Sequence, residues 1–183
     1  MAKINIHFTL DAQTREYCRT INTEIRKLTN SIIIFDDNSP MIPHISLVMG
    51  ELDPNYTIEH IASTIRNVSG YLKPMTFCVL SPYLETVRNR YIFSDIDTDT
   101  AFSSLKRQFH DLLNPKYVLA QNDYTEVPHI TLGHVEEKQE KVREYLASVK
   151  TDFTFTSEHI EISEVGLKGT CINSLFLYRL SKI

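Results

Sequence analysis

The sequence contains one hexapeptide motif twice, as IPHISL at positions 42–47 and as VPHITL at positions 127–132. In both copies a proline precedes a histidine, an isoleucine separates that histidine from a hydroxyl side chain, and a leucine follows. The two histidines, His44 and His129, are 85 positions apart. A histidine two residues before a serine or threonine is a weak pattern, and a third such triple begins at His7. The matched context of the two hexapeptides therefore carries the functional hypothesis.

Each hexapeptide has the pattern of a β-strand on which the histidine and the hydroxyl share one face. Residues two apart on a strand point to the same side of the sheet, so we expect His44 to lie beside Ser46. The same spacing places His129 beside Thr131. The apolar residues between them then point to the opposite face, into the core. The proline before each histidine suits the entry of a strand, where a missing N–H group is tolerated.

Two imidazoles and two hydroxyls that face one cleft could catalyse displacement at a phosphodiester. Histidine has a reference pKa of about 6.5, so one ring can accept a proton from the nucleophile while the other donates one to the leaving oxygen. The hydroxyls can donate hydrogen bonds to a phosphate oxygen. The sequence shows neither a Cys/His cluster with metal-ligand spacing nor a G-x-S-x-G nucleophile turn. We therefore expect no metal and no other cofactor.

The composition is that of a soluble globular protein. Of the 183 residues, 42% are hydrophobic and 23% are charged, and the formal net charge is −4. This negative charge argues against a broad surface for long nucleic acids and favours a short RNA or a nucleotide-sized substrate. The three cysteines follow no metal or disulfide pattern, no apolar run is long enough to span a membrane, and the N-terminal residues lack a signal-peptide core. These features predict a cytoplasmic protein without membrane contact, which we expect to be a monomer.

The apolar periodicity predicts an α+β fold. Alternating and short apolar runs predict strands at 3–10, 44–52, 75–80, 90–96, 129–135, 153–165 and 173–180. Apolar residues at helical spacing predict helices at 11–28, 56–68, 98–113 and 137–149. Asp11 is the expected N-cap of the first helix. In the first strand, His7 and Thr9 occupy the polar face, where we expect His7 to be a surface histidine.

The two halves of the chain repeat one order of elements: strand, helix, histidine strand, helix, strand, strand. The strand and helix before the second motif are displaced from those before the first by about the same distance as the motifs themselves. We predict a single domain over residues 1–183, with one lobe at about 1–87 and a second at about 88–183. Mainly antiparallel sheets should line a central cleft, with the helices outside. A pseudo-twofold duplication would bring both histidine strands to that cleft.

The paired tetrapeptides HISL and HITL, on strands of a duplicated bilobal chain of this size, resemble the signature of the 2H phosphoesterase superfamily. That superfamily includes RNA 2′,5′-ligase-like proteins, 2′,3′-cyclic-nucleotide phosphodiesterases and 2′,5′-oligoadenylate phosphodiesterases. The resemblance covers nearly the whole chain and implies a metal-independent phosphodiesterase that acts on a ribonucleotide 2′,3′-cyclic phosphate or 2′,5′-phosphodiester. It implies that His44 and His129 are the general base and the general acid, in an order that the sequence leaves open. Ser46 and Thr131 would bind the substrate phosphate.

Several residues outside the motifs are further candidates. Tyr124, just before the second motif, could stack on a base or bind phosphate. Lys168 lies in a GLKG turn that could close over the cleft, and Arg88 lies near the boundary of the lobes. For Lys168 and Arg88, a solvated turn without a functional role is the simpler interpretation. Strand parity places His134 on the face opposite the motif histidine, and His110 lies within a helix, so neither is a predicted site residue.

Three other functions are compatible with the same residues. A catalytically inactive module that binds nucleotides or RNA ends would use the same cleft. An RNA 2′,5′-ligase would run the same chemistry in reverse. A purely structural duplication would bind no phosphate at all.

Overall fold

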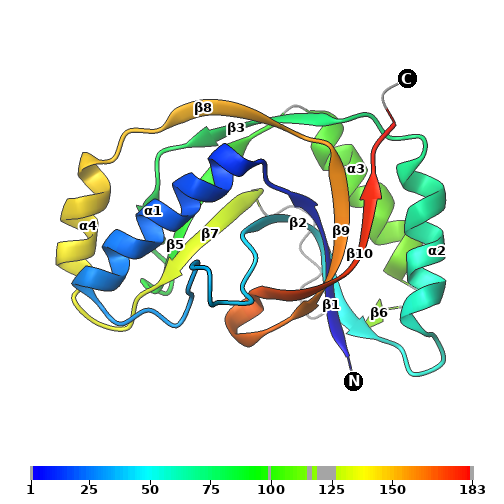
Figure 1. The fold of residues 1–183 in the computed structure, drawn as a ribbon, viewed down its shortest axis with the longest axis horizontal. Coiled ribbons are helices and arrows are strands. Elements are labelled where there is room, and N and C mark those ends of the chain that lie inside the picture. The colour runs from blue at the N-terminus through cyan, green and yellow to red at the C-terminus, as the bar shows by residue number, and fades with distance from the viewer. Residues whose placement is uncertain (1, 99, 115–116, 119–126, 182–183) are drawn as a thin grey trace.

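The computed structural model describes residues 2–98, 100–114, 117–118 and 127–181, and it shows the predicted α+β fold with two antiparallel sheets (Figure 1). The helices are α1 (Ala12–Leu28), α2 (Ile58–Ser69), α3 (Thr100–Leu113) and α4 (Gln139–Ser148). The strands are β1 (Lys3–Thr9), β2 (His44–Leu52), β3 (Met75–Leu80), β4 (Tyr83–Leu84), β5 (Tyr91–Asp97), β6 (Tyr117–Val118), β7 (His129–His134), β8 (Asp152–Ser157), β9 (His159–Val165) and β10 (Cys171–Arg179). A short 3-10 turn, η2 (Leu167–Gly169), connects β9 with β10.

The predicted strand at 153–165 is two strands that belong to different sheets. β8 pairs with β3, whereas β9 pairs with β1 and β10. The chain runs along the top of the molecule as β8 and then turns down into β9 (Figure 1). The hydroxyl of Ser157 donates to the carbonyl of His159 at 3.1 Å and supports this turn. No glycine or proline marks the turn in the sequence, and the prediction of one continuous strand is therefore wrong.

Each sheet combines strands from both halves of the chain. One sheet has the order β10-β9-β1-β2-β6, and the other has the order β4-β5-β3-β8 with β7 paired to β5. Thus β9 and β10 extend the sheet of the first motif strand, and β3 and β4 extend the sheet of the second. The predicted lobes, about 1–87 and about 88–183, therefore exchange strands instead of forming one sheet each.

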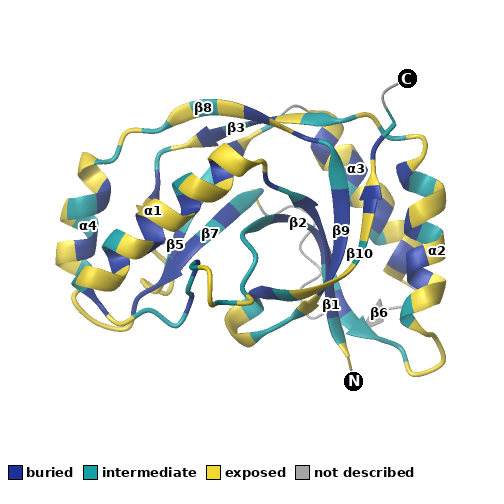
Figure 2. Ribbon diagram, in the orientation of Figure 1, coloured by how far each residue is buried: buried dark blue, intermediate teal, exposed yellow. Residues whose placement is uncertain are grey.

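The helices cross between the halves in the same way. α1 follows β1 in the sequence but packs against β7 and α4 of the other sheet, and α3 follows β5 but packs against β2. α2 packs against β10. Figure 2 shows exposed residues along the outer faces of these helices and buried residues on the faces turned toward the sheets. The predicted N-cap is confirmed, because the Asp11 carboxylate accepts the N–H of Thr14 at 2.8 Å.

Both motif strands contain a β-bulge at the equivalent position. The register of β1 with β2 shifts after Ile6 and leaves Leu47 as the extra residue. The register of β5 with β7 shifts at the corresponding place and leaves Leu132 extra. Both leucines are buried and directly follow the motif hydroxyl. Since an extra residue reverses the alternation of side chains beyond it, each bulge ends the stretch in which simple parity holds.

The bulge at Leu132 corrects the predicted position of His134. His134 pairs with Tyr91, and the two rings meet edge to face with their centroids 5.1 Å apart. Directly paired residues in an antiparallel sheet share a face, so His134 lies on the face of Tyr91. This is also the face of His129, and not the opposite face that strand parity predicts. The side chain is nevertheless buried and is not part of the cavity lining described below.

Candidate active site

The two motif strands, which belong to different sheets, contribute to one cavity of about 820 Å³. His44 and Ser46 line it from β2, and His129 and Thr131 line it from β7. The structure thus brings together the four residues that the repeated hexapeptide singles out. The cavity is the cleft that a duplicated fold was expected to form.

The ring of His44 is held by the backbone and sits in a desolvated place. Its Nδ1 donates to the carbonyl of Ile42 at 2.8 Å, and because a carbonyl can only accept, Nδ1 carries the proton of the neutral ring. The Nε2 atom is then an acceptor, and the amide nitrogen of Asn5 lies 3.0 Å from it. Burial lowers the pKa of His44 to about 4, and the Ile42 bond offsets part of this effect. His44 is therefore neutral at pH 7.

The ring of His129 has the same backbone contact but a different neighbour. Its Nδ1 donates to the carbonyl of Val127 at 3.0 Å, which again leaves Nε2 as the atom available to a ligand. The aromatic ring of Phe93 lies against the imidazole, with the two centroids 4.0 Å apart. This contact packs the ring of His129 against the cavity wall and fixes its orientation.

The hydroxyl of Ser46 is oriented by a hydrogen bond that it accepts. The Asn5 amide nitrogen donates to Ser46 Oγ at 2.8 Å, which leaves the Ser46 hydrogen free to be donated to a ligand. Thr131 pairs with Phe93 across β5 and β7 and is half-buried at the cavity wall. The two hydroxyls therefore come from opposite sheets, as the two imidazoles do.

An aromatic wall that the sequence analysis missed lies beside His129. Tyr91 and Phe93 line the cavity with nearly parallel rings, at an interplanar angle of 10° and a centroid distance of 5.9 Å. Tyr83 lines it from β4 and meets Phe93 edge to face at 6.3 Å. The signal was present, because aromatic residues at 91 and 93 must share one face of a strand.

Cationic residues surround the cavity although the whole chain is acidic. They come from β1, the loop after β4, α3 and η2, and they are Lys3, Arg88, Lys106 and Lys168, together with His110. Arg88 and Lys168 are exposed, as expected for residues of solvated turns, but both also line the cavity, and His110, which was not a predicted site residue, lines it as well. The four-residue spacing of Lys106 and His110 on α3 was the signal for their shared face.

Glu85 is the one carboxylate in the described lining, and it accepts hydrogen bonds from backbone N–H groups of its own loop. Its oxygens accept the backbone N–H groups of Val87, Arg88 and Arg90 at 2.8 to 3.1 Å. Burial alone would raise the pKa of Glu85, but the backbone N–H groups of Arg88, Arg90, Val87 and Tyr91 together outweigh it and hold the pKa below its usual value. The loop is thereby fixed in place, and the cavity keeps its positive character.

His7 is not the surface histidine that we expected. It is fully buried on β1, with its ring centroid 4.8 Å from that of His44. Its Nε2 lies 3.0 Å from Ser163 Oγ and 3.9 Å from a Glu161 oxygen. Burial, and then the nearby charge of protonated His44, lower the pKa of His7 well below its usual value. Tyr124, the remaining candidate, lies outside the described residues.

Two further classes of site have no counterpart in the described part of the chain. Among the residues placed by the structure, no group of three or more His, Cys, Asp and Glu side chains is arranged to hold a metal ion. No described helix has the length and apolar character needed to cross a membrane.

Known proteins resemble this chain in family and in fold. The family model described as the 2′-5′ RNA ligase superfamily matches residues 23–167. No curated protein matches the sequence. The solved structures with a similar fold include TT0787 of Thermus thermophilus (15% identity, 97% of each chain, TM-score 0.69), E. coli LigT complexed with ATP (14%, 99% of each chain, 0.63) and a phosphoesterase (13%, 99% of each chain, 0.65). At these identities the similarity concerns the fold.

Proposed function

The chain belongs to the 2′-5′ RNA ligase superfamily of 2H phosphoesterases and ligase-like proteins, and from that premise we propose that it is a metal-independent phosphodiesterase. The proposed substrate is a ribonucleotide 2′,3′-cyclic phosphate or 2′,5′-phosphodiester. One observation carries the proposal: two histidines and two hydroxyls from different sheets line a single cavity. Groups on both sides of a phosphate are what an in-line displacement requires.

In the proposed mechanism, His44 is the general base and His129 is the general acid. Neutral His44 takes the proton of the attacking water or hydroxyl as the new phosphorus–oxygen bond forms. Protonated His129 gives its proton to the leaving oxygen as the old bond breaks. Ser46 and Thr131 donate hydrogen bonds to the non-bridging oxygens, where negative charge increases in the transition state.

The remaining lining supports a substrate that carries a base and several negative charges. The flat wall of Tyr91 and Phe93 suits stacking of a nucleobase. Lys168 and Arg88 are proposed to contact further phosphate oxygens, and Tyr124 stays a proposed substrate contact. A cavity of about 820 Å³ is large enough for a nucleotide. The structural relative LigT has been solved with ATP, which is consistent with nucleotide binding here.

We also propose that the protein acts in the cytoplasm as a monomer. The cysteines support a reducing compartment, since Cys18, Cys78 and Cys171 are free thiols. Elution at the mass of one chain in size-exclusion chromatography with light scattering would agree with this proposal, and a dimer mass would contradict it.

The function is tested by product analysis in EDTA on two substrates, a nucleoside 2′,3′-cyclic phosphate and a 2′,5′-linked oligoadenylate. Wild-type protein should turn over one of them, and both His44→Ala and His129→Ala should lose that turnover while they keep the fold. Loss of activity in EDTA, or full activity in both variants, would contradict the proposal. Binding without product would instead indicate a nucleotide-binding module, and joined RNA ends would indicate a ligase.

A further inference from the structure

A buried carboxamide lies between the two functional side chains of the first motif. Asn5 belongs to β1 and is 0% exposed. Its Nδ2 atom lies 3.0 Å from His44 Nε2 and 2.8 Å from Ser46 Oγ. Its Oδ1 atom is buried and has no hydrogen-bond partner among the residues that the structure describes. Asn5 does not line the cavity, so it acts on the substrate only through His44 and Ser46.

The bulge in β2 creates this arrangement. Asn5 pairs with Met49, and His7 pairs with Ser46, because Leu47 is skipped between the two pairings. The two β1 side chains therefore stay on the same face as the motif residues. In an unbroken register, the partner of His7 would be Leu47, and the carboxamide would lie one residue further from the motif.

The hydrogen bonds that this carboxamide can make depend on the charge of His44. When His44 is neutral, the two hydrogens of the NH₂ group are donated to Nε2 and to Ser46 Oγ, and Oδ1 is left unpaired. When His44 is protonated, Nε2 becomes a donor and can no longer face the NH₂ group. Rotation of the amide by half a turn then brings Oδ1 to Nε2, where it accepts the new hydrogen. An unpaired buried oxygen is costly, and protonation of His44 supplies its missing partner.

We propose that Asn5 is a positioning residue for proton transfer at His44, and that its carboxamide serves both protonation states by exchanging donor for acceptor. The proposal rests on the proposed function for the step in which His44 takes a proton. Because Nε2 has a single lone pair, the NH₂ group must release it before the ring takes a proton, and the rotated carboxamide then accepts the new N–H. Asn5 would also keep the hydrogen of Ser46 directed toward the phosphate in the neutral state.

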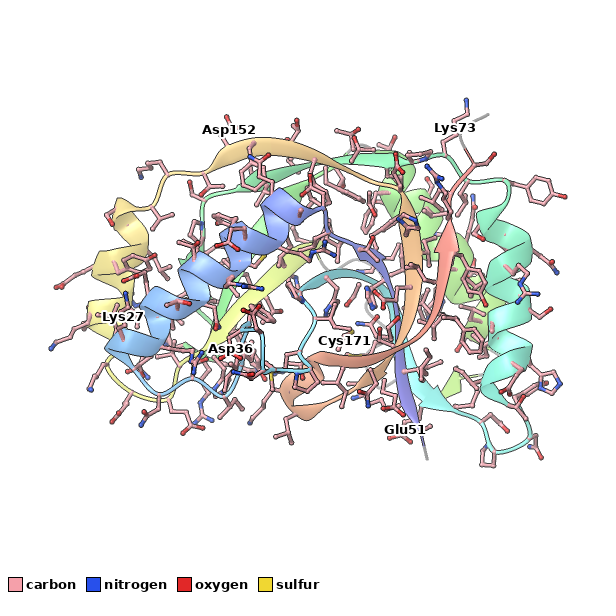
Figure 3. The ribbon with its side chains drawn as sticks, viewed as in Figure 1. Lys27, Asp36, Glu51, Lys73, Asp152 and Cys171 are labelled. Atoms are coloured by element: carbon pink, nitrogen blue, oxygen red, sulfur yellow. The ribbon has the colours of Figure 1, made fainter. Side chains whose placement is uncertain are left out.

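The other titratable groups around His44 do not both donate to the neutral Nε2 and accept from the protonated one. His7 packs on it from β1, Cys171 Sγ lies 3.5 Å from its Nε2 from β10, and His129 faces it across the cavity. Burial raises the pKa of the Cys171 thiol, which is therefore neutral. The carboxylate of Glu161 on β9 approaches His7. Figure 3 labels Cys171 at the start of β10, where its backbone forms a bridge with Ile42 just before the first motif strand.

The test is an NMR titration of the imidazole nitrogens of His44, which needs no substrate. Wild-type His44 should be the neutral, Nδ1-protonated ring at neutral pH. Asn5→Asp places a permanent acceptor at Nε2, so it should raise the midpoint of His44 protonation by about 1 to 3 pH units. The matched control is Asn55→Asp, which adds the same charge at an exposed loop residue and should leave the midpoint unchanged.

A second variant covers the case in which Asn5→Asp does not fold. Asn5→Leu removes both the donor to the neutral ring and the acceptor for the protonated ring. Because a hydrogen bond from a charged group is the stronger of the two, the His44 midpoint should fall. A midpoint that does not rise in folded Asn5→Asp, or that does not fall in folded Asn5→Leu, would overturn the role of Asn5. A midpoint that rises in a protein without turnover would support Asn5 and count against the proposed function alone. Turnover in the wild type together with an unchanged His44 midpoint in the variants would count against the role of Asn5 alone.

Discussion

At the scale of single residues, His44 and His129 share one contact and differ in their neighbours. Each ring donates from Nδ1 to the carbonyl two residues before it, so the repeated hexapeptide produces the same tautomer twice. His44 lies against the buried His7 and Asn5, and His129 lies against the aromatic ring of Phe93. The sequence repeat thus explains the pair, and the surroundings explain why the two rings can take different roles.

The hydroxyls of the motifs should matter for binding the transition state. Ser46→Ala and Thr131→Val should each lower kcat/KM by about 10-fold to 100-fold, because each removes one hydrogen bond to a charged oxygen worth roughly 1.5–3 kcal/mol. Steady-state kinetics on the substrate identified above provide the measurement. The control is Ser104→Ala on the exposed face of α3. Wild-type kcat/KM in both motif variants would show that the hydroxyls do not contact the phosphate.

The motif residues were predictable, and their partners were not, for one physical reason. His44 and Ser46 are two positions apart, so strand geometry alone places them together. Asn5, His7 and Phe93 reach the site through strand pairing, which depends on register and not on local pattern. Alternation did indicate that Asn5 and His7 share one face of their strand. It could not indicate that this face is buried.

At the scale of elements, the loop after β4 connects the aromatic wall with the cationic rim. Glu85 holds the backbone of this loop through three N–H groups, and Arg88 within it lines the cavity. The loop leads directly into Tyr91 at the start of β5. Its geometry therefore determines how a ligand meets both features.

Replacement of Glu85 should loosen this loop. Glu85→Gln keeps the size of the side chain but turns an NH₂ group toward backbone donors, so we expect a loss of about 1–3 kcal/mol in the free energy of unfolding. The KM should rise more than kcat falls, because the catalytic residues lie on other elements. Urea unfolding and steady-state kinetics measure the two effects. Glu144→Gln on the exposed face of α4 is the control, and equal stability of the two variants would contradict the role of Glu85.

The helices and most strands were predictable to within two residues, because each has a clear apolar period. The turn between β8 and β9, the two bulges and the exchange of strands between the lobes were not. These features depend on which distant segment supplies the hydrogen-bond partners, and the local pattern is the same either way. The wrong position of His134 followed from the bulge at Leu132, where parity fails.

At the scale of the whole molecule, a basic cavity lies within an acidic chain. The net charge is −4, yet the cavity lining includes Lys3, Arg88 and Lys168. Attraction of an anionic substrate should therefore be local and should weaken with added salt. We expect KM to rise with ionic strength and Lys168→Gln to reduce that dependence. Lys73→Gln is the control, because Lys73 is exposed and is not part of the cavity lining. A KM that does not change with ionic strength would contradict the prediction.

The buried His7 and the half-buried His44 should make the fold sensitive to mild acid. Burial holds the pKa of His7 and His44 below the unfolded value, so the unfolded chain binds more protons once the pH falls below about 6.5. Stability should then fall with decreasing pH, by up to about 1.4 kcal/mol per unit for each histidine, and for His44 down to about pH 4.

Urea unfolding at about pH 7.5 and about pH 5.5 measures this loss. His7→Gln removes one of the two groups and should make the free energy of unfolding less dependent on pH. His60→Gln replaces an exposed histidine at the start of α2 and should not. A variant at His7 with the full wild-type dependence would contradict the prediction.

The most direct test of the two-histidine mechanism compares a natural phosphodiester with one whose leaving group is p-nitrophenolate, which departs without receiving a proton. His129→Ala should lose about 100-fold or more in kcat on the natural substrate and recover most of that loss on the activated one. His44→Ala should lose activity on both, since the nucleophile needs its base in either case. Recovery in His44→Ala instead would reverse the assignment of base and acid. Equal losses on both substrates for both variants would contradict the division of proton transfer between the two histidines.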